Sequence, residues 1–275
     1  MKYIELAVAC ADSTESEITT ALLSDFPFDS FAEEQGWLKA YIREDDFRSN
    51  REEIERYLGQ SGRKYELTEI PDRNWNTLWE SNFEPIRIDS RCRIRAPFHA
   101  ADPSFEYEIE IMPKMSFGTG HHATTRLMAA EILDSDFREQ RGLDMGSGTA
   151  VLAILAAMKG AAHVDAIDID PWSYTNGTEN VAANGVSDRV TPALGDATLL
   201  RGRSYDFVLA NINRNILLAD MEAYAHTLSP GGTLIVSGIL EADTGILCDK
   251  AHGLGFGDGR VRTHDGWAAI RFTKR

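Results

Sequence analysis

The alternation of strand-like and helix-like segments from residue 142 onward constrains the fold of this 275-residue chain more than any other feature. In chain order the segments are Gly142–Met145, Val151–Lys159, Val164–Ile169, Tyr174–Asn184, Val190–Leu194, Phe207–Asn211, Ile216–Leu228 and Thr233–Ile239. Short apolar strands linked by helices predict an α/β domain with a parallel sheet that is covered on both faces. Ligands of such domains bind beyond the carboxyl ends of the strands.

The two ends of the chain have other patterns. An Asp265-Gly266 turn between two β-rich segments predicts an antiparallel hairpin at the end of the α/β domain. The first seventy residues read as strand, helix, strand, strand, helix and strand: Lys2–Ala9, Glu15–Leu23, Phe28–Glu33, Trp37–Ile42, Arg51–Leu58 and Tyr65–Ile70. This order is typical of a small α+β ferredoxin-like module, which serves many functions. We assign residues 1–60 to this domain, 61–72 to a linker and 73–275 to the α/β domain.

Charge and composition exclude several classes of function. A net charge of −15 disfavours tight binding to a phosphate backbone, so we expect no direct nucleic-acid partner. The acidic surface suits a basic protein partner, or it serves solubility alone. No apolar run is long enough to span a membrane, and the acidic start of the chain does not resemble a secretion signal, which predicts a cytoplasmic protein. The three scattered cysteines predict neither a disulfide framework nor a metal site.

Three strand ends carry candidate ligand-binding residues. Gly146 and Gly148 follow the first strand of the α/β domain, and glycines there let a ligand approach the backbone at a helix start. Asp168 ends the next strand, where an acid can accept hydrogen bonds from ribose hydroxyls. Asn211 ends a third strand, either as a ligand-binding residue or as a structural turn residue.

These residues suit a nicotinamide-dependent dehydrogenase as well as a methyltransferase. Asp144, directly before the glycines, distinguishes the two, because its charge is unfavourable beside a pyrophosphate and favourable beside the ammonium and sulfonium groups of S-adenosylmethionine. Asp170, followed by Pro171, is better explained as the N-cap of the next helix.

A further segment, Phe117-Gly118-Thr119-Gly120-His121-His122-Ala123-Thr124-Thr125, resembles the signature of the PrmA family, the methyltransferases of ribosomal protein L11. Trp75, Trp79, Phe83 and Pro85 resemble the entry motif of that family's catalytic domain, although the two tryptophans alone would indicate a packed helix face. The resemblance runs through the glycine turn and through Asn180 to Val186, and it covers most of residues 72–275.

The resemblance implies a Rossmann-like, seven-stranded class I methyltransferase domain preceded by a ferredoxin-like domain that recognises the substrate. It implies S-adenosylmethionine as cofactor, bound by Thr125, Gly146, Asp168 and Asn211. It also implies that methyl groups go to lysine side chains and to the chain terminus of ribosomal protein L11, and we expect the enzyme to be a monomer.

Three residues, at two places in the sequence, depart from the family pattern. Ala150 replaces the usual third glycine of the turn, at a position that we interpret as one of close packing that tolerates alanine. Asn213 and Arg214 replace the usual residues after Asn211, so we expect them to alter the acceptor pocket.

The reaction requires a neutral amine, and the sequence offers Asn211 to hold it in line for transfer. His122 is either a general base or, as we favour, a hydrogen-bonding residue that organises the signature loop. Alternatives are a methyltransferase with a small-molecule or glutamine acceptor, a non-catalytic nucleotide-binding protein and a nicotinamide oxidoreductase.

Overall fold

The computed structural model describes residues 3–23, 26–34, 36–70, 84–114 and 117–275. The chain divides into two compact units, Met1–Phe83 and Glu84–Arg275, each described here by itself. No helix among the described residues is both long and apolar enough to cross a membrane.

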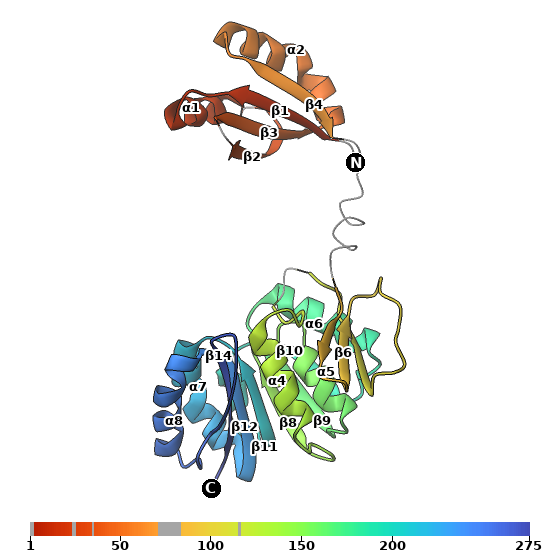
Figure 1. Ribbon diagram of the computed structural model, residues 1–275, viewed down its shortest axis with the longest axis vertical. Coiled ribbons are helices and arrows are strands. Elements are labelled where there is room, and N and C mark those ends of the chain that lie inside the picture. The colour runs from red at the N-terminus through yellow and green to blue at the C-terminus, as the bar shows by residue number, and fades with distance from the viewer. Residues whose placement is uncertain (1–2, 24–25, 35, 71–83, 115–116) are drawn as a thin grey trace. The chain divides into compact units, whose positions relative to one another are not determined.

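The first unit is a four-stranded antiparallel sheet with two helices, in the predicted order of elements (Figure 1). Its elements are β1 (Tyr3–Ala9), α1 (Ser13–Leu23), β2 (Phe28–Glu34), β3 (Trp37–Arg43), α2 (Glu44–Ser61) and β4 (Tyr65–Ile70). The strands lie in the order β2-β3-β1-β4. Alternate residues of β1 and β3 are buried against Ile54 and Leu58 of α2, as the period-2 pattern of these strands requires.

The structure corrects two boundaries of this unit. Helix α2 begins at Glu44, seven residues before the predicted start. Three acidic residues in its first turn stabilise this start, because their negative charges lie at the positive end of the helix dipole. Residues 61–72, predicted as a linker, contain β4, which pairs with β1 from Tyr3↔Ile70 to Val8↔Tyr65. The first unit therefore extends beyond residue 60. Trp75 and Trp79 lie outside the described residues.

The second unit is built on a mixed sheet, which within the described residues has seven strands in the order β10-β9-β8-β11-β12-β14-β13. The strands are β8 (Arg141–Met145), β9 (His163–Asp168), β10 (Val190–Leu194), β11 (Tyr205–Asn211), β12 (Leu228–Leu240), β13 (Arg260–His264) and β14 (Trp267–Thr273). The first five are parallel, and β14 is antiparallel to both β12 and β13. The predicted α/β architecture and the hairpin at Asp265-Gly266 are confirmed.

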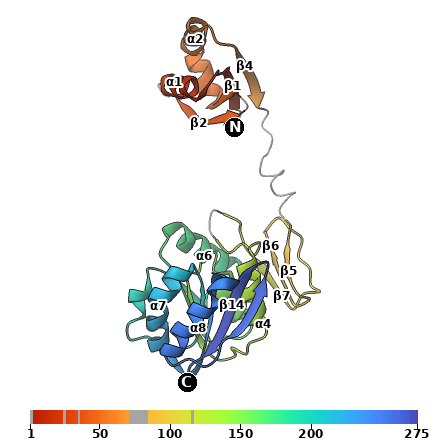
Figure 2. The ribbon, with the colours of Figure 1, turned by 60° about the vertical axis from the view of Figure 1, so that its left-hand side comes forward.

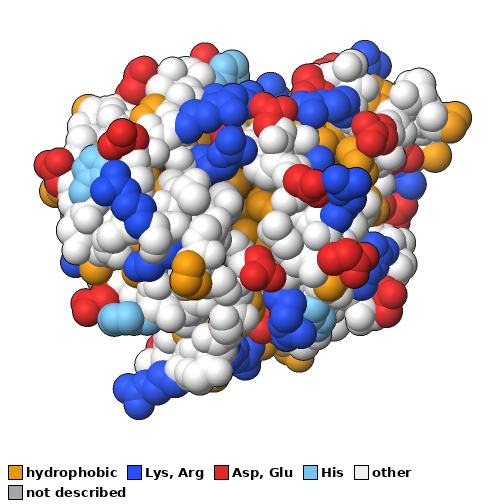
Figure 3. All heavy atoms as spheres, turned by 90° about the horizontal axis from the view of Figure 1, so that it is seen from below, with side chains coloured by type: hydrophobic (Ala, Val, Ile, Leu, Met, Phe, Trp, Pro, Cys, Tyr) orange, Lys and Arg blue, Asp and Glu red, His pale blue; other side chains and the backbone are white. Residues whose placement is uncertain are grey.

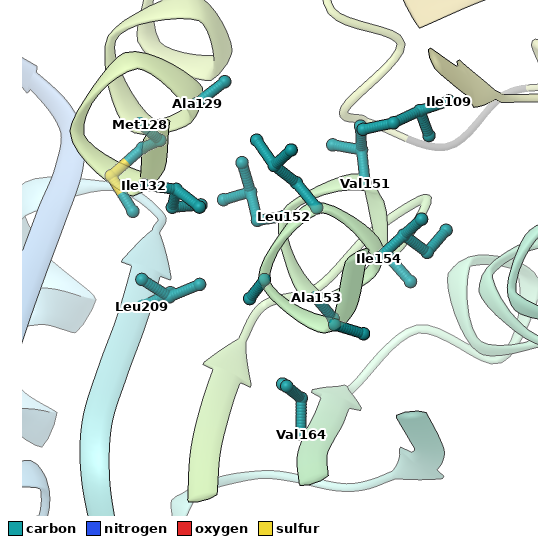
Figure 4. Close-up of a cluster of buried hydrophobic side chains, with 14 of the residues drawn as sticks. Ile109, Met128, Ala129, Ile132, Val151, Leu152, Ala153, Ile154, Val164 and Leu209 are labelled. Carbon is teal, nitrogen blue, oxygen red and sulfur yellow. The ribbon is translucent and has the colours of Figure 1, made fainter. Parts of the chain in front are cut away.

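Helices cover both faces of this sheet (Figure 2). Helices α4 (Ala123–Leu133), α5 (Val151–Met158) and α6 (Pro171–Ala183) contribute to one buried cluster, and α7 (Arg214–Thr227) and α8 (Thr244–Gly253) to the other. Short 3-10 helices, η1 (Ala197–Leu200) and η2 (Glu241–Asp243), complete the connections. Figure 4 shows side chains of α4 and α5 pointing toward each other and toward Leu209 of β11. Because β11 alternates between the two clusters, its residues are apolar on both faces.

A three-stranded sheet before α4 was not predicted. It consists of β5 (Ile86–Ile88), β6 (Cys92–Arg95) and β7 (Tyr107–Glu110), in that order. Alternate apolar residues of these strands join the cluster of α4 and α5. The other face carries ion pairs between β6 and β7, Arg93 with Glu108 at 2.8 Å and Arg95 with Glu110 at 2.8 Å.

Asn180 and Asn184, which belong to the family-like segment, connect α6 to its neighbours. The Asn180 amide donates to the Thr149 carbonyl at 3.0 Å and accepts from the Met112 backbone N–H at 3.0 Å. Asn184 exchanges hydrogen bonds with the backbone of Glu110. These contacts fix the glycine turn and the end of β7 against one helix.

The backbone at Ala150 corrects our interpretation of that position. Ala150 has a φ of 62°, in the left-handed region, and its methyl group is fully buried. A left-handed conformation costs a residue with a Cβ roughly 1–2 kcal/mol, which a glycine avoids. Conformation, as well as close packing, therefore explains a glycine at this position.

We predict that Ala150→Gly leaves the free energy of unfolding within about 0.5 kcal/mol of the wild-type value. Relief of the left-handed strain offsets roughly 0.5–1 kcal/mol of chain entropy and about 0.8 kcal/mol of lost methyl burial. Ala153→Gly, at a buried helical position, is the matched control and should lose about 1.5 kcal/mol. Urea denaturation measures both, and equal losses would contradict the assignment of strain to Ala150.

Candidate cofactor and active site

A cavity of about 560 Å³ opens at the carboxyl ends of the parallel strands of the second unit. It lies where β8 has β9 on one side and β11 on the other, at the point where the strand order reverses. The residues that line it are Phe117, His122, Thr124, Met145, Gly146, Gly148, Asp168, Ile169, Ser173, Gly195, Asp196, Ala197, Asn211, Ile212, Asn213, Ile216, Asp220, Gly238 and Trp267. The volume is suitable for a cofactor-sized molecule.

The glycine turn after β8 leaves no room for side chains. Gly146 has a φ of 70°, and a Cβ on it would lie 2.3 Å from the Ile212 side chain. Gly148 has a φ of 54°, and a Cβ there would lie 2.3 Å from the carbonyl oxygen of Phe117. Both glycines line the cavity, as the sequence predicted for a ligand that approaches the backbone.

Asp168 is a buried carboxylate held by two backbone donors. One oxygen accepts from the Gly148 N–H at 2.7 Å and the other from the Asp170 N–H at 2.9 Å. A carboxylate has about four lone-pair sites, so acceptor capacity remains on the side that faces the cavity. Asp170 is the N-cap of α6, as predicted, and accepts from the Ser173 N–H at 2.9 Å.

The signature loop lies against the glycine turn. The Thr149 hydroxyl donates to the Gly118 carbonyl at 2.7 Å, and the Thr149 N–H donates to the Phe117 carbonyl at 3.0 Å. His122 is the N-cap of α4, where its Nδ1 accepts from the Thr124 N–H at 3.3 Å. The rings of Phe117 and Trp267 lie 5.3 Å and 4.7 Å from the His122 ring, so the three form an aromatic wall of the cavity.

The structure separates the two threonines of the signature. Thr124 lines the cavity, whereas Thr125 does not. Thr125 is fully buried, and within the described ranges its hydroxyl has no hydrogen-bond partner. The structure thus brings three of the four predicted cofactor-binding residues, Gly146, Asp168 and Asn211, to one cavity. Thr125, the fourth, has its side chain outside the cavity lining, so the cofactor would have to reach beyond this lining to contact it.

Asn211 and its successors have distinct positions. Asn211 lines the cavity and is buried, and its Oδ1 lacks a partner among the residues that the structure describes. Asn213 also lines the cavity, and it is the N-cap of α7, accepting from the Ile216 N–H at 3.1 Å. Arg214 is not part of the lining and forms an ion pair with Asp243 at 2.7 Å. Of the two departures that follow Asn211, Asn213 lines the cavity and Arg214 does not.

Asp144 precedes the cavity-lining Met145 on β8, and it is fully buried and does not itself line the cavity. One oxygen accepts from the Ala153 N–H at 3.1 Å, and the other has no partner among the described residues. Burial raises the pKa of Asp144 to about 7, against the opposing effect of the Ala153 N–H and with a smaller contribution from the charge of Asp168. A cation bound nearby would therefore stabilise the ionised form of this carboxyl group.

Sequence analysis missed several residues of the cavity, among them Asp196, Asp220, Gly238 and Trp267. Asp196 comes two residues after the end of β10, much as Asp168 ends β9. Its place at a strand end is therefore a sequence feature that could have identified it. Asp220 lies on α7, and burial raises its pKa. Gly238 lies near the carboxyl end of β12, which is parallel to β11. Trp267 begins β14, and the antiparallel pairing of β14 with β12 brings it to the cavity.

The lining of the cavity is acidic. Three carboxyl groups, those of Asp168, Asp196 and Asp220, contribute to it, and no Lys or Arg is among the described residues that line it. Such a surface favours a cationic ligand over one that carries a pyrophosphate.

Comparisons with known proteins agree with this geometry. Residues 2–275 match the family model of ribosomal protein L11 methyltransferase (PrmA). The chain is 42% identical over 279 residues to a ribosomal protein L11 methyltransferase of Phocaeicola vulgatus, covering 99% of each chain. It is 44% identical over 285 residues to the protein of the same description in Porphyromonas gingivalis, covering 99% of this chain and 98% of that one. A solved structure of ribosomal protein L11 methylase from Lactobacillus delbrueckii superposes with a TM-score of 0.64 at 25% identity, covering 70% of this chain and 100% of that one.

We predict that Asp144→Asn stabilises the cofactor-free protein at high pH only. Between about pH 4 and pH 7 the unfolded chain releases the Asp144 proton while the folded protein retains it, so wild-type stability falls as the pH rises through this window. Asparagine does not titrate, so the variant should gain up to roughly 4 kcal/mol over wild type above pH 7, at 1.36 kcal/mol per pKa unit, and nothing near pH 4.

Urea denaturation at pH 4.5 and pH 8 measures this difference, with Asp188→Asn as a control at an exposed carboxyl group. The contrary result is a difference in free energy of unfolding between the two proteins that is the same at both pH values. That result would show that Asp144 is ionised in the folded protein at both.

Proposed function

Because this chain belongs to the ribosomal protein L11 methyltransferase (PrmA) family, we propose that it transfers methyl groups from S-adenosylmethionine to amino groups of ribosomal protein L11. The acceptors that we propose are lysine side chains and the amino terminus of that protein. The observation that carries the proposal is the acidic cavity at the carboxyl ends of β8, β9, β10 and β11, lined by three aspartates.

The residues present suit S-adenosylmethionine. Asp168 would accept hydrogen bonds from the ribose hydroxyls, and the turn Gly146–Gly148 allows the cofactor to lie against the backbone. The unpartnered Oδ1 of Asn211 and the buried carboxyl of Asp144 favour the positive charges of the cofactor. When bound, S-adenosylmethionine supplies a methyl group activated by its sulfonium.

The acceptor amine must lose a proton before it can react, because an ammonium has no lone pair. A free lysine is neutral only about one time in 2,500 at pH 7. The aromatic wall of Phe117, His122 and Trp267 removes water from a lysine chain that enters the cavity, and desolvation lowers the pKa of its amine. Asn211 Oδ1 can then accept a hydrogen bond from the neutral amine and hold it in line.

The contacts of His122 support a positioning role for this residue. Its Nδ1 lies 2.8 Å from the Thr124 hydroxyl and 3.3 Å from the Thr124 backbone nitrogen. This ring nitrogen is thus already engaged at the first turn of α4. This supports the prediction that His122 organises the signature loop, and it disfavours His122 as general base.

The first unit suits the presentation of a protein substrate. Its strand order β2-β3-β1-β4 and its β-α-β-β-α-β sequence support a ferredoxin-like module, separate from the unit that contains the cavity. We propose that this module recognises L11. That the enzyme is a cytoplasmic monomer without nucleic-acid or membrane partners remains a prediction.

The direct test is incubation of the purified protein with methyl-labelled S-adenosylmethionine and purified ribosomal proteins. We expect label in one protein, L11, on amino groups that mass spectrometry identifies. Label on glutamine or on a small molecule alone would support the rival acceptors, and cofactor binding without any transfer would support a non-catalytic binding protein.

We predict that Asp168→Ala weakens binding of S-adenosylmethionine at least tenfold, because a hydrogen bond to a charged group contributes about 1.5–3 kcal/mol. Calorimetric titration measures the dissociation constant. Asp170→Ala, which removes the α6 cap two residues away, is the matched control and should change affinity by less than about threefold. Equal effects of the two variants would remove Asp168 from the proposed cofactor site.

We predict that Asn211→Ala lowers kcat for L11 methylation about 10- to 1,000-fold, because the amine loses the acceptor that orients it. Asn213→Ala serves as the control, since that side chain lines the same cavity and caps α7. It should alter KM for the acceptor more than kcat. Steady-state kinetics separates the two, and an unchanged kcat in Asn211→Ala would exclude the catalytic role.

A further inference from the structure

A second cavity, of about 650 Å³, lies in the same unit and has a different character. We call it the arginine cavity and define it by its lining residues Glu84, Pro85, Ile86, Arg87, Arg93, His121 and Arg126. Its walls come from β5, β6, the signature loop and the first turn of α4. It shares no lining residue with the cofactor cavity.

Basic groups dominate the arginine cavity. It contains three guanidinium groups and one carboxylate, in a chain with 43 acidic and 28 basic residues. Elsewhere charges of opposite sign tend to lie together, as on the face drawn in Figure 3, where Lys and Arg side chains lie beside Asp and Glu. A concentration of one sign inside a cavity focuses the field on whatever enters it.

In the described part of the chain, two of the three arginines form no ion pair. Arg93 donates to Glu108 at 2.8 Å and to the Ala100 carbonyl at 2.9 Å, so its charge is compensated. Among the described residues neither Arg87 nor Arg126 forms an ion pair, and Arg87 lies 5.5 Å from the centre of the Phe105 ring. The Nε of Arg126 is buried and has no hydrogen-bond partner in the described part of the chain.

The adjacent histidines of the signature loop face different cavities. His122 lines the cofactor cavity and His121 lines the arginine cavity. Burial lowers the pKa of His121, the Glu84 backbone opposes this, and the charge of Arg126 adds to it. The imidazole of His121, whose Nδ1 lies 3.2 Å from the Thr119 hydroxyl, therefore adds no further positive charge to the arginine cavity.

We propose that the arginine cavity binds a carboxylate group, with Arg126 and Arg87 as its main ligands. The planar fork of a guanidinium matches the two oxygens of a carboxylate. Two arginines that form no ion pair with the described residues, beside the Glu84 carboxylate, suit a monoanion better than a dianionic phosphate. The carboxylate belongs either to a small free acid or to an acidic side chain of a peptide, and the cavity volume admits both.

The test is titration of the full-length, isotope-labelled protein, followed by amide and Arg Nε–H chemical shifts. The probes are butyrate, a blocked tripeptide with a central glutamate, and inorganic phosphate. We expect saturable shifts of Arg126 and Arg87 with a carboxylate probe, and a dissociation constant at least tenfold larger in Arg126→Gln. Arg126→Lys, which keeps the charge and loses the fork, should bind more tightly than Arg126→Gln.

Arg138→Gln is the matched control, because Arg138 is an exposed arginine paired with Asp136 and does not line the cavity. It should bind like wild type. A tighter complex with the peptide than with butyrate identifies a peptide as the source of the carboxylate, and equal affinities identify a small acid. Absence of saturable shifts, equal binding in Arg126→Gln and wild type, or tighter binding of phosphate than of either carboxylate would overturn the proposal. Melting temperatures of all variants verify that each is folded.

Discussion

The hydrogen bond from the Gly148 N–H to the Asp168 carboxylate, 2.7 Å long, joins the two strand ends on which the cofactor cavity is built. The Phe117 carbonyl packs against the same glycine, in space that a Cβ would otherwise occupy, so the signature loop can lie directly against the turn. Three segments that are distant in the sequence meet at this one residue. Any side chain at position 148 would force them apart, and the cavity depends on their contact.

The chemistry follows from what surrounds this junction. The parallel strands direct their carboxyl ends to one edge of the sheet, where backbone groups and three aspartates are exposed to a ligand. Burial of Asp144 beneath the turn leaves a carboxyl group that a bound cation would stabilise. A fold shared with nucleotide-binding enzymes is thereby adapted to a positively charged donor, and the aromatic wall on the other side is suited to a lysine chain.

Sequence analysis predicted those features that depend on local chemistry. The cap at Asp170 with Pro171 follows from neighbouring residues, and so do the strand ends at Asp168 and Asn211. It missed the sheet β5-β6-β7, because β6 and β7 carry charged residues that are unusual in short strands. Only the pairing of the two strands shows that each arginine has a glutamate partner. The cofactor contact of Thr125, which the family resemblance implies, stays a prediction. Adjacent helical residues differ in direction by about 100°, and in this structure Thr124 is the one that lines the cavity.

The central claim is that the cavity is charged for a cationic adenosyl cofactor. Calorimetric titration of the full-length protein with S-adenosylmethionine and, separately, with NAD tests it most directly. We expect saturable binding of S-adenosylmethionine at one site and much weaker or no binding of NAD, whose pyrophosphate would lie among the three aspartates. Binding of NAD with comparable affinity, or no binding of S-adenosylmethionine, would contradict the account.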